Sequence, residues 1–352
     1  MKERVGISMA NDCIRTDLAV EIREKLEKDN QVEGVVFKQK YIHDADIKVS
    51  KVVIQNDEAQ KIMGKSKGTY YTFEALNLPC NDGGFHEEVS YYVAGYLKKI
   101  LSRLLKGKKP PYHILVAGLG NRSATSDSLG PKVIDNLDIT QNIYVAKKEQ
   151  SEVNKSKRND KKTGDDYADD KEKTERRFAY VSGIAPGVMG QTGMETADII
   201  GGIIETVIPD ALIVVDALAA GNAKRLANTI QITDTGIMPG SGVGNHRNAI
   251  NKKNMGIPVV AIGVPMVVEA SAIVADAVEL FFESVVNSAN EAINSATNTY
   301  QSFSKEEKKQ FVEELMPDNM AKMYVTPKDI DETIKRISYT VSEAINMCMS
   351  TE

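Results

Sequence analysis

The chain has 352 residues, of which 42% are hydrophobic and 26% are charged, a balance typical of globular proteins. Its 44 basic and 49 acidic residues give a net charge of −5, which argues against a large basic face and a direct nucleic-acid partner. Three scattered cysteines, Cys13, Cys80 and Cys348, exclude a disulfide framework and a CxxC zinc site. Because no apolar run is long enough to cross a bilayer and the N-terminus lacks a secretory pattern, we expect a cytoplasmic protein without a membrane partner.

The predicted elements begin with a helix over Glu87–Leu105, whose apolar residues fall on one face. Short apolar runs then alternate with helical patterns. The predicted strands are His113–Ala117, Ala211–Val215, Thr229–Thr233 and Pro258–Val264. The predicted helices are Leu129–Leu137, Glu195–Val207 and Ala270–Val286. This alternation predicts an α/β fold with a mostly parallel twisted sheet and helices on both faces.

Residues 303–350 predict a C-terminal helical segment. Ser304 and Glu307 have the spacing of a capping box at the start of one helix. Thr326-Pro327 begins another, which carries an apolar stripe from Ile330 to Ile345. Stripes of this kind are typical of helices that pack on a core.

One segment interrupts the alternation of strands and helices. Residues 147–177 contain 11 basic and 9 acidic residues among 31, with almost no apolar side chains. Such a segment buries too little surface to offset the entropy lost on ordering, so we predict a disordered surface insertion. The alternative is a docking segment for a charged partner.

The loop after the strand His113–Ala117 reads GLGNRSATSDSLGP. Its glycine pair is reminiscent of a nucleotide-binding loop, but the third Rossmann glycine is replaced by Ser123, and no lysine follows at Walker A spacing. The loop instead delivers one carboxylate, Asp127, just before a helix. Asp127 is therefore either a helix cap or a functional group.

A second carboxylate, Asp216, directly follows the apolar run LIVV. A carboxylate at the end of a buried strand is costly unless it is paired or faces a cleft, and ligands of open α/β sheets bind at the carboxyl ends of strands. If the two strands are neighbours, Asp127 and Asp216 face one crevice, where one can be ionised while the other holds a proton. That pair could activate water against a peptide carbonyl; the alternative for Asp216 is a loop hydrogen bond.

Other motifs give weaker indications. Asp234-Thr-Gly has the tripeptide of pepsin-like proteases, but in α/β surroundings and as a single copy, which favours a turn. Two glycine-rich loops could line a groove or form an oxyanion site, or could simply be tight loops. They contain Gly187 and Gly190, and Gly240, Gly242 and Gly244. The four isolated histidines and the cysteines form no metal-ligand motif, so we expect no metal and no other cofactor.

These residues together resemble the germination protease family of endospore-forming bacteria. The matching stretches are RTDLAVE at 15–21, the GLGN and SDSLGP parts of 118–131, APGVMGQTGMETADII at 185–200, VVDALAA at 214–220, QITDTGIMPGSGVGNHR at 231–247, GIPVVAIGVP at 256–265 and VTPKDID at 325–331. The resemblance implies a fold similar to that of hydrogenase-maturation peptidases. It also implies an atypical aspartic endopeptidase that begins the degradation of small acid-soluble spore proteins in the spore core during germination, with Asp127 and Asp216 as its carboxylate pair.

The resemblance further implies a homotetramer made as a zymogen that removes its own N-terminus. The cleaved bond would join Asp17 and Leu18, making 1–17 a propeptide and 18–352 a single α/β protease domain with the 147–177 insertion and the 303–350 helical segment. Two positions depart from the family pattern: Glu269 stands where we expect Asp, and His246 where we expect Lys. The alternatives are a metal-dependent maturation peptidase, with His246 as a ligand, and a non-catalytic binding module.

Overall fold

The computed structural model describes residues 16–27, 32–142, 145, 177–240, 248–285, 291–317, 319–320 and 323–350. Nearly all of the predicted propeptide 1–17, and all of the predicted insertion 147–177 except Arg177, thus lie outside the described residues. Within the described ranges, no helix combines the length and the apolar character that a bilayer crossing requires.

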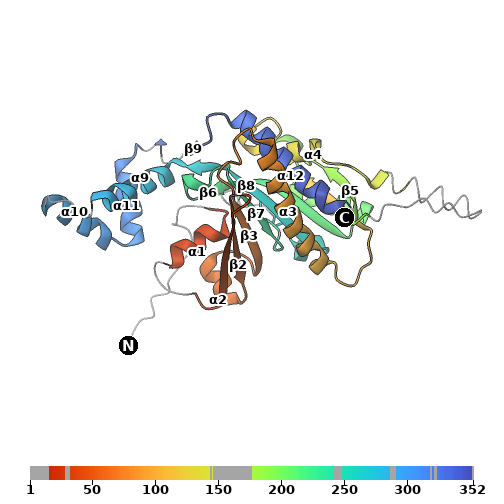
Figure 1. The fold of residues 1–352 in the computed structure, drawn as a ribbon, viewed down its shortest axis with the longest axis horizontal. Coiled ribbons are helices and arrows are strands. Elements are labelled where there is room, and N and C mark those ends of the chain that lie inside the picture. The colour runs from red at the N-terminus through yellow and green to blue at the C-terminus, as the bar shows by residue number, and fades with distance from the viewer. Residues whose placement is uncertain are drawn as a thin grey trace, which may run out of the picture.

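The described strands form one nine-stranded sheet in the order β1-β2-β3-β7-β8-β6-β4-β5, with β9 against β8 (Figure 1). The strands are β1 Val35–Ile42, β2 Ile47–Ile54, β3 Gly68–Glu74, β4 Tyr112–Gly118, β5 Ala179–Ile184, β6 Ala211–Ala220, β7 Thr229–Thr233, β8 Val259–Glu269 and β9 Tyr324–Val325. Neighbours among β8, β6, β4 and β5 are parallel, while the remaining pairs are antiparallel. The predicted α/β fold is confirmed, and the sheet is mixed: the predicted parallel arrangement is limited to β8, β6, β4 and β5, and the other pairs are antiparallel.

The four predicted strands are all present, and two of them are longer than the apolar runs suggested. Strand β6 continues to Ala220 and β8 to Glu269, because the two strands keep pairing after β4 has ended at Gly118. Both are buried on their two faces over most of their length, as expected for central parallel strands. The buried carboxylate of Asp216 therefore lies within β6 and not after it.

The antiparallel strands β1, β2 and β3 were not predicted from the sequence. Strand β1 is largely solvent-exposed, and its sequence VVFKQKYI alternates too little to distinguish it from a loop. It pairs with β2, which in turn pairs with β3, and β3 joins the central sheet through β7. Only the pairing of β3 with β7 connects residues far apart in the chain, and that pairing depends on the tertiary structure.

Helices cover both faces of the sheet, as predicted. On one face α3 (Gly83–Leu104), α4 (Leu129–Asp135) and α12 (Ile330–Met349) pack into the largest apolar core, with α3 and α12 side by side (Figure 1). The opposite face is covered by α7 (Thr196–Val207). The shorter elements are α1 Ala19–Glu27, α2 Asp57–Met63, η1 Thr125–Asp127, α6 Met189–Thr192, η2 Ala223–Arg225 and α8 Lys252–Met255.

Three further helices extend away from the sheet at one end of the molecule (Figure 1). They are α9 Ala270–Val285, α10 Glu291–Ser302 and α11 Lys305–Leu315. The predicted capping box is present at α11: the Ser304 hydroxyl accepts from the Glu307 N–H, and the Glu307 carboxylate accepts from the Ser304 N–H. These helices pack against one another, and α9 joins the sheet through the end of β8.

Candidate active site

Asp127 ends the 3-10 turn η1, in the loop that follows β4. One oxygen of its carboxylate, Oδ2, accepts from the Asn121 N–H at 2.8 Å, and the main-chain oxygen of Asp127 accepts from the same N–H at 3.0 Å. The carboxylate therefore stabilises its own loop, and it is not the side-chain cap of α4, whose N-cap is Ser128. Its side chain remains partly exposed at the carboxyl end of β4.

The glycines of this loop allow close backbone packing and do not form a phosphate cradle. A Cβ on Gly118 would lie 2.1 Å from the main-chain oxygen of Gly130, and one on Gly130 would lie 2.3 Å from that of Leu119. Gly120 has a φ of +110°, and a Cβ there would lie 2.0 Å from the main-chain oxygen of Asp127. The glycine spacing in the sequence thus reflects a fold in which η1 and α4 press onto the end of β4.

Replacing Gly120 with alanine is expected to displace Asp127. The new methyl group meets backbone, which cannot move aside as a side chain can, and the φ is unfavourable for any L-residue. We expect a loss of about 1–3 kcal/mol in the free energy of unfolding and a lower rate of peptide cleavage. Urea unfolding and a cleavage assay measure both. The control is Gly202→Ala in α7, where a Cβ has open space; equal behaviour of the two variants would contradict this account.

Asp216 lies at the same end of the sheet as Asp127. It is 6% exposed, and its Oδ1 accepts from the Ala217 N–H at 3.0 Å. Strands β4 and β6 are neighbours, and the Leu119 N–H donates to the Val215 oxygen immediately beyond β4. Since η1 also packs against β6 and β8, the loop that carries Asp127 lies over the strand that carries Asp216. The sequence prediction required neighbouring strands, and this requirement is met.

The first glycine-rich loop is joined to the Asp127 loop by a side-chain hydrogen bond. Gln191 in α6 donates from Nε2 to Oδ1 of Asn121 at 2.7 Å. Gly187 precedes α6 with a φ of +76°, and Gly190 lies within this short helix. Asn121, which the motif contained but the sequence analysis did not single out, thus contacts both loops through its main chain and its side chain.

The second glycine-rich loop is only partly described. Gly240 has a φ of +72° in a turn after β7. Gly242, Gly244 and His246, predicted as loop or ligand residues, lie outside the described residues. Glu269, the other departure from the family pattern, ends β8 and accepts from the Tyr324 hydroxyl at 3.2 Å.

Asp234, of the Asp-Thr-Gly tripeptide, has a structural environment. Its Oδ1 accepts from the Thr69 N–H at 2.7 Å, and its Oδ2 forms an ion pair with Arg103. These contacts hold the loop after β7 against the start of β3 and the end of α3. The predicted turn explains this residue without catalysis.

Asp234→Asn is accordingly expected to fold and to keep full peptidase activity. Asparagine still accepts from the Thr69 N–H but loses the ion pair with Arg103, whose side chain is 49% exposed, so the expected loss of stability is about 1 kcal/mol or less. Thermal unfolding and a cleavage assay measure the two quantities. A loss of activity without a loss of stability would place Asp234 in the chemistry instead.

The segment Thr16–Glu21 lies across the carboxyl end of β6. Its three apolar residues, Leu18, Ala19 and Val20, are fully buried, and Leu18 and Val20 cluster with Leu218 of β6. The predicted cleavage bond, between Asp17 and Leu18, is therefore in the folded core and not on a loose arm.

Asp17 is bound to a single residue of β6. Its N–H donates to the Ala219 oxygen at 3.0 Å, and its Oδ2 accepts from the Ala219 N–H at 2.9 Å. Lys65 Nζ lies 3.9 Å from Oδ1 of Asp17. Burial lowers the pKa of Lys65, and the charges of Asp17 and Glu21 counteract part of that effect.

The other acidic residue of the segment, Glu21, is held by the chain after β6. It is 2% exposed, and its Oε2 accepts from the Gly221 N–H at 2.7 Å. Arg225 lies 3.8 Å from Oε1 of Glu21 and also binds Glu24 and Glu74. Burial disfavours the charged guanidinium, but its bonds to Glu24 and the charges of all three glutamates outweigh burial and raise the pKa of Arg225. The sequence analysis did not identify Arg225, because its partners are remote in the chain.

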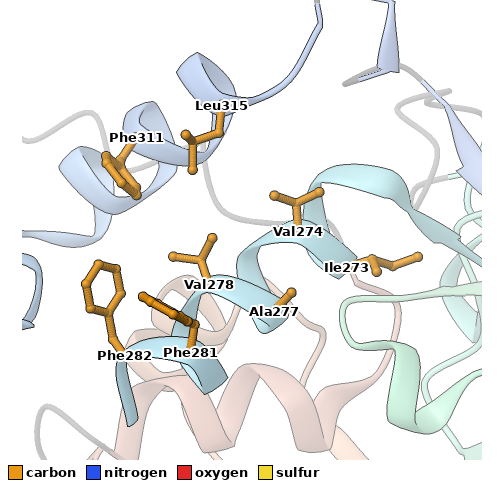
Figure 2. Close-up of a pocket in the computed structure, with 8 residues that line it drawn as sticks. All are labelled: Ile273, Val274, Ala277, Val278, Phe281, Phe282, Phe311 and Leu315. Carbon is orange, nitrogen blue, oxygen red and sulfur yellow. The ribbon is translucent and has the colours of Figure 1, made fainter. Parts of the chain in front are cut away.

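Two other features among the described residues were candidates for a site, a metal-ligand cluster and a pocket. Across the described ranges, no group of three or more His, Cys, Asp or Glu side chains is placed to hold a metal ion. An open pocket of about 420 Å³ lies between α9 and α11 and is lined only by apolar side chains (Figure 2). This lining provides no acid, base or nucleophile, so the pocket is not a candidate active site.

Comparison with known proteins identifies the family. A model of the germination protease family matches residues 14–159 and 163–322. A germination protease of Clostridium perfringens is 39% identical over 338 residues, 96% of this chain and 95% of that protein. Another, from Caldanaerobacter subterraneus subsp. tengcongensis, is 38% identical over 336 residues, 96% of this chain and 94% of that protein. A third, from Bacillus cereus, is 38% identical over 266 residues, 74% of this chain and 64% of that protein.

A solved structure also aligns with part of the chain. The [NiFe] hydrogenase maturation protease HycI from Thermococcus kodakarensis covers 47% of this chain and 80% of its own, with 19% sequence identity and a TM-score of 0.25. The family match and the full-length relatives, in contrast, show that the chain is a peptidase that belongs to the germination protease family.

Proposed function

We propose that this peptidase cleaves its own chain between Asp17 and Leu18 and then acts as an endopeptidase on small acid-soluble spore proteins during germination. The observation that carries the proposal is the docking of Thr16–Glu21 on β6, the strand that contains Asp216. A segment with acidic ends and a buried apolar centre is held there as a peptide substrate would be. Membership of the family supports this proposed substrate class.

Asp127 and Asp216 would supply the chemistry. An ionised carboxylate takes a proton from water as the water oxygen adds to the carbonyl carbon, and a protonated carboxyl gives its proton to the carbonyl oxygen or to the leaving nitrogen. In this proposal the two carboxylates share one site, where they would not readily ionise together. Breaking the C–N bond then leaves one new carboxylate and one new amine, and consumes only water.

Family membership supports three further parts of the proposal. We propose that the chain is a zymogen whose residues 1–17 are the propeptide, that the enzyme works in the spore core, and that it assembles as a homotetramer. The carboxylate pair makes it an atypical aspartic peptidase on an α/β fold, with no metal in the reaction.

The test follows the N-terminus of the purified full-length chain at mildly acidic pH by intact mass. We expect a new N-terminus at Leu18 and cleavage of a synthetic peptide of residues 12–24 at the same bond, both unchanged by a strong chelator. An Asp216→Asn chain controls for a contaminating protease. Absence of cleavage in both assays would contradict the proposal. Cleavage that requires added nickel would favour the metal-dependent maturation peptidase instead.

A further inference from the structure

Gln231 of β7 contacts the peptide on both sides of the bond between Asp17 and Leu18. Its Nε2 donates to the Asp17 carbonyl oxygen at 3.2 Å, and its Oε1 accepts from the Ala19 N–H at 2.9 Å. The side chain is buried, with an exposed fraction of 5%. A primary amide provides a donor and an acceptor at one tip, so the Gln231 side chain can reach both partners from β7.

The sheet register places Gln231 and Asp216 in one row across three strands. Both residues are the register partners of Gly263 in β8, Gln231 from β7 and Asp216 from β6. Residues in one row of a sheet project from the same face, and two strand spacings separate the Cα atoms of Gln231 and Asp216 by about 10 Å. The Asp17 carbonyl is held by the tip of Gln231 on the face from which Asp216 also projects.

The central residue of this row leaves space for Leu218, on which the bound segment packs. Gly263 has no side chain, and a Cβ there would lie 2.4 Å from Cδ1 of Leu218. Leu218 thus lies over Gly263, and Leu18 and Val20 pack on Leu218. The apolar residues that follow the cleavage bond therefore pack on Leu218. Asp17, which precedes the bond, is hydrogen-bonded to the main chain of Ala219.

We propose that Gln231 holds the Asp17–Leu18 bond in register for self-cleavage and stabilises the negative charge that develops on the Asp17 carbonyl oxygen. This inference rests on the proposed self-cleavage by the carboxylate pair. When the water oxygen bonds to the Asp17 carbonyl carbon, the π electrons of the C=O bond move to its oxygen, to which the Gln231 amide already donates. The C–N bond then breaks, and the Leu18 nitrogen takes up a proton.

If Gln231 acts through its hydrogen bonds, its variants should differ in their rate of self-cleavage in an order that a purely packing role does not predict. Gln231→Met keeps the volume of the side chain and removes both hydrogen bonds. Gln231→Glu keeps an acceptor for the Ala19 N–H but sets a carboxylate oxygen against the Asp17 carbonyl oxygen, where charge repulsion opposes the reaction. Loss of one oxyanion donor commonly lowers rates by about 100-fold or more. We therefore expect self-cleavage about 100-fold slower in Gln231→Met and slower still in Gln231→Glu.

The experiment uses the full-length chain and follows the rate and the position of N-terminal cleavage by intact mass. The control is Gln310→Ala on the surface of α11, where the glutamine donates to Glu314. Melting temperatures report folding separately, and in the Met variant we also expect new cleavage at bonds next to Asp17–Leu18, because the register is no longer held. Wild-type rates and an unchanged cleavage position in both Gln231 variants would overturn the proposed role of Gln231 and leave the proposed self-cleavage standing. A wild-type chain that is never cleaved would overturn the proposed function.

Discussion

Asparagine at either Asp127 or Asp216 is expected to slow self-cleavage between Asp17 and Leu18 by at least about 1,000-fold. Asparagine has nearly the same shape as aspartate but cannot take or give the proton that the reaction requires. At position 127 it can still accept from the Asn121 N–H, the contact that Oδ2 makes at 2.8 Å, so the loop is expected to remain in place. Intact mass over time measures the rate, and circular dichroism confirms folding.

The double variant distinguishes a cooperating pair from two independent residues. Groups that act as one catalytic unit show strongly non-additive losses, because the second removal damages a reaction that has already been lost. We expect the Asp127→Asn, Asp216→Asn chain to be no slower than the slower single variant. Asp234→Asn is the matched control and is expected to cleave at the wild-type rate. More than a tenth of wild-type activity in either single variant would contradict the assignment.

Arg225→Met is expected to produce the largest loss of stability. Arg225 is 8% exposed, and it binds Glu24 at 2.7 Å through each of two guanidinium nitrogens and Glu74 at 3.2 Å. It is also within 3.8 Å of the buried Glu21. Removing one partner from a buried ion pair leaves uncompensated charge, at a cost of about 3–5 kcal/mol. Since Glu24 is partly exposed, we expect a loss of about 3 kcal/mol.

Urea unfolding measures this loss, and Arg122→Met provides the matched control. Arg122 pairs with Asp135 where both side chains are about half exposed, so its removal is expected to change stability by less than about 1 kcal/mol. Because Arg225 connects α1 to the end of β3, limited proteolysis of its variant should also cut within residues 17–27 more readily. If Arg225→Met lowers the free energy of unfolding by less than about 1 kcal/mol, solvent and not Arg225 stabilises the negative charges of these glutamates.

Much of the central fold followed from local patterns. Apolar runs such as Ala211–Val215 are bounded by turn residues and buried on both faces, so the runs themselves indicate parallel strands of an α/β sheet. The capping box at Ser304 is equally local, because both of its hydrogen bonds lie within four residues. Asp216 was also identifiable by itself, since a carboxylate next to an apolar run demands an explanation.

Only the tertiary structure determined which distant residues lie beside the cleavage bond. No local pattern indicates that Gln231 and Asp216 share Gly263 as their register partner, because strand order and register depend on the packing of the whole sheet. The partners of Arg225 were inaccessible for the same reason. Strand β1 pairs with the next strand along the chain, and it was missed because its sequence alternates too little. The sequence by itself determined the fold class and singled out Asp127, in the loop after β4, and Asp216 of β6. Long-range pairing decided that these strands are neighbours and that residues 16–21 lie across one of them.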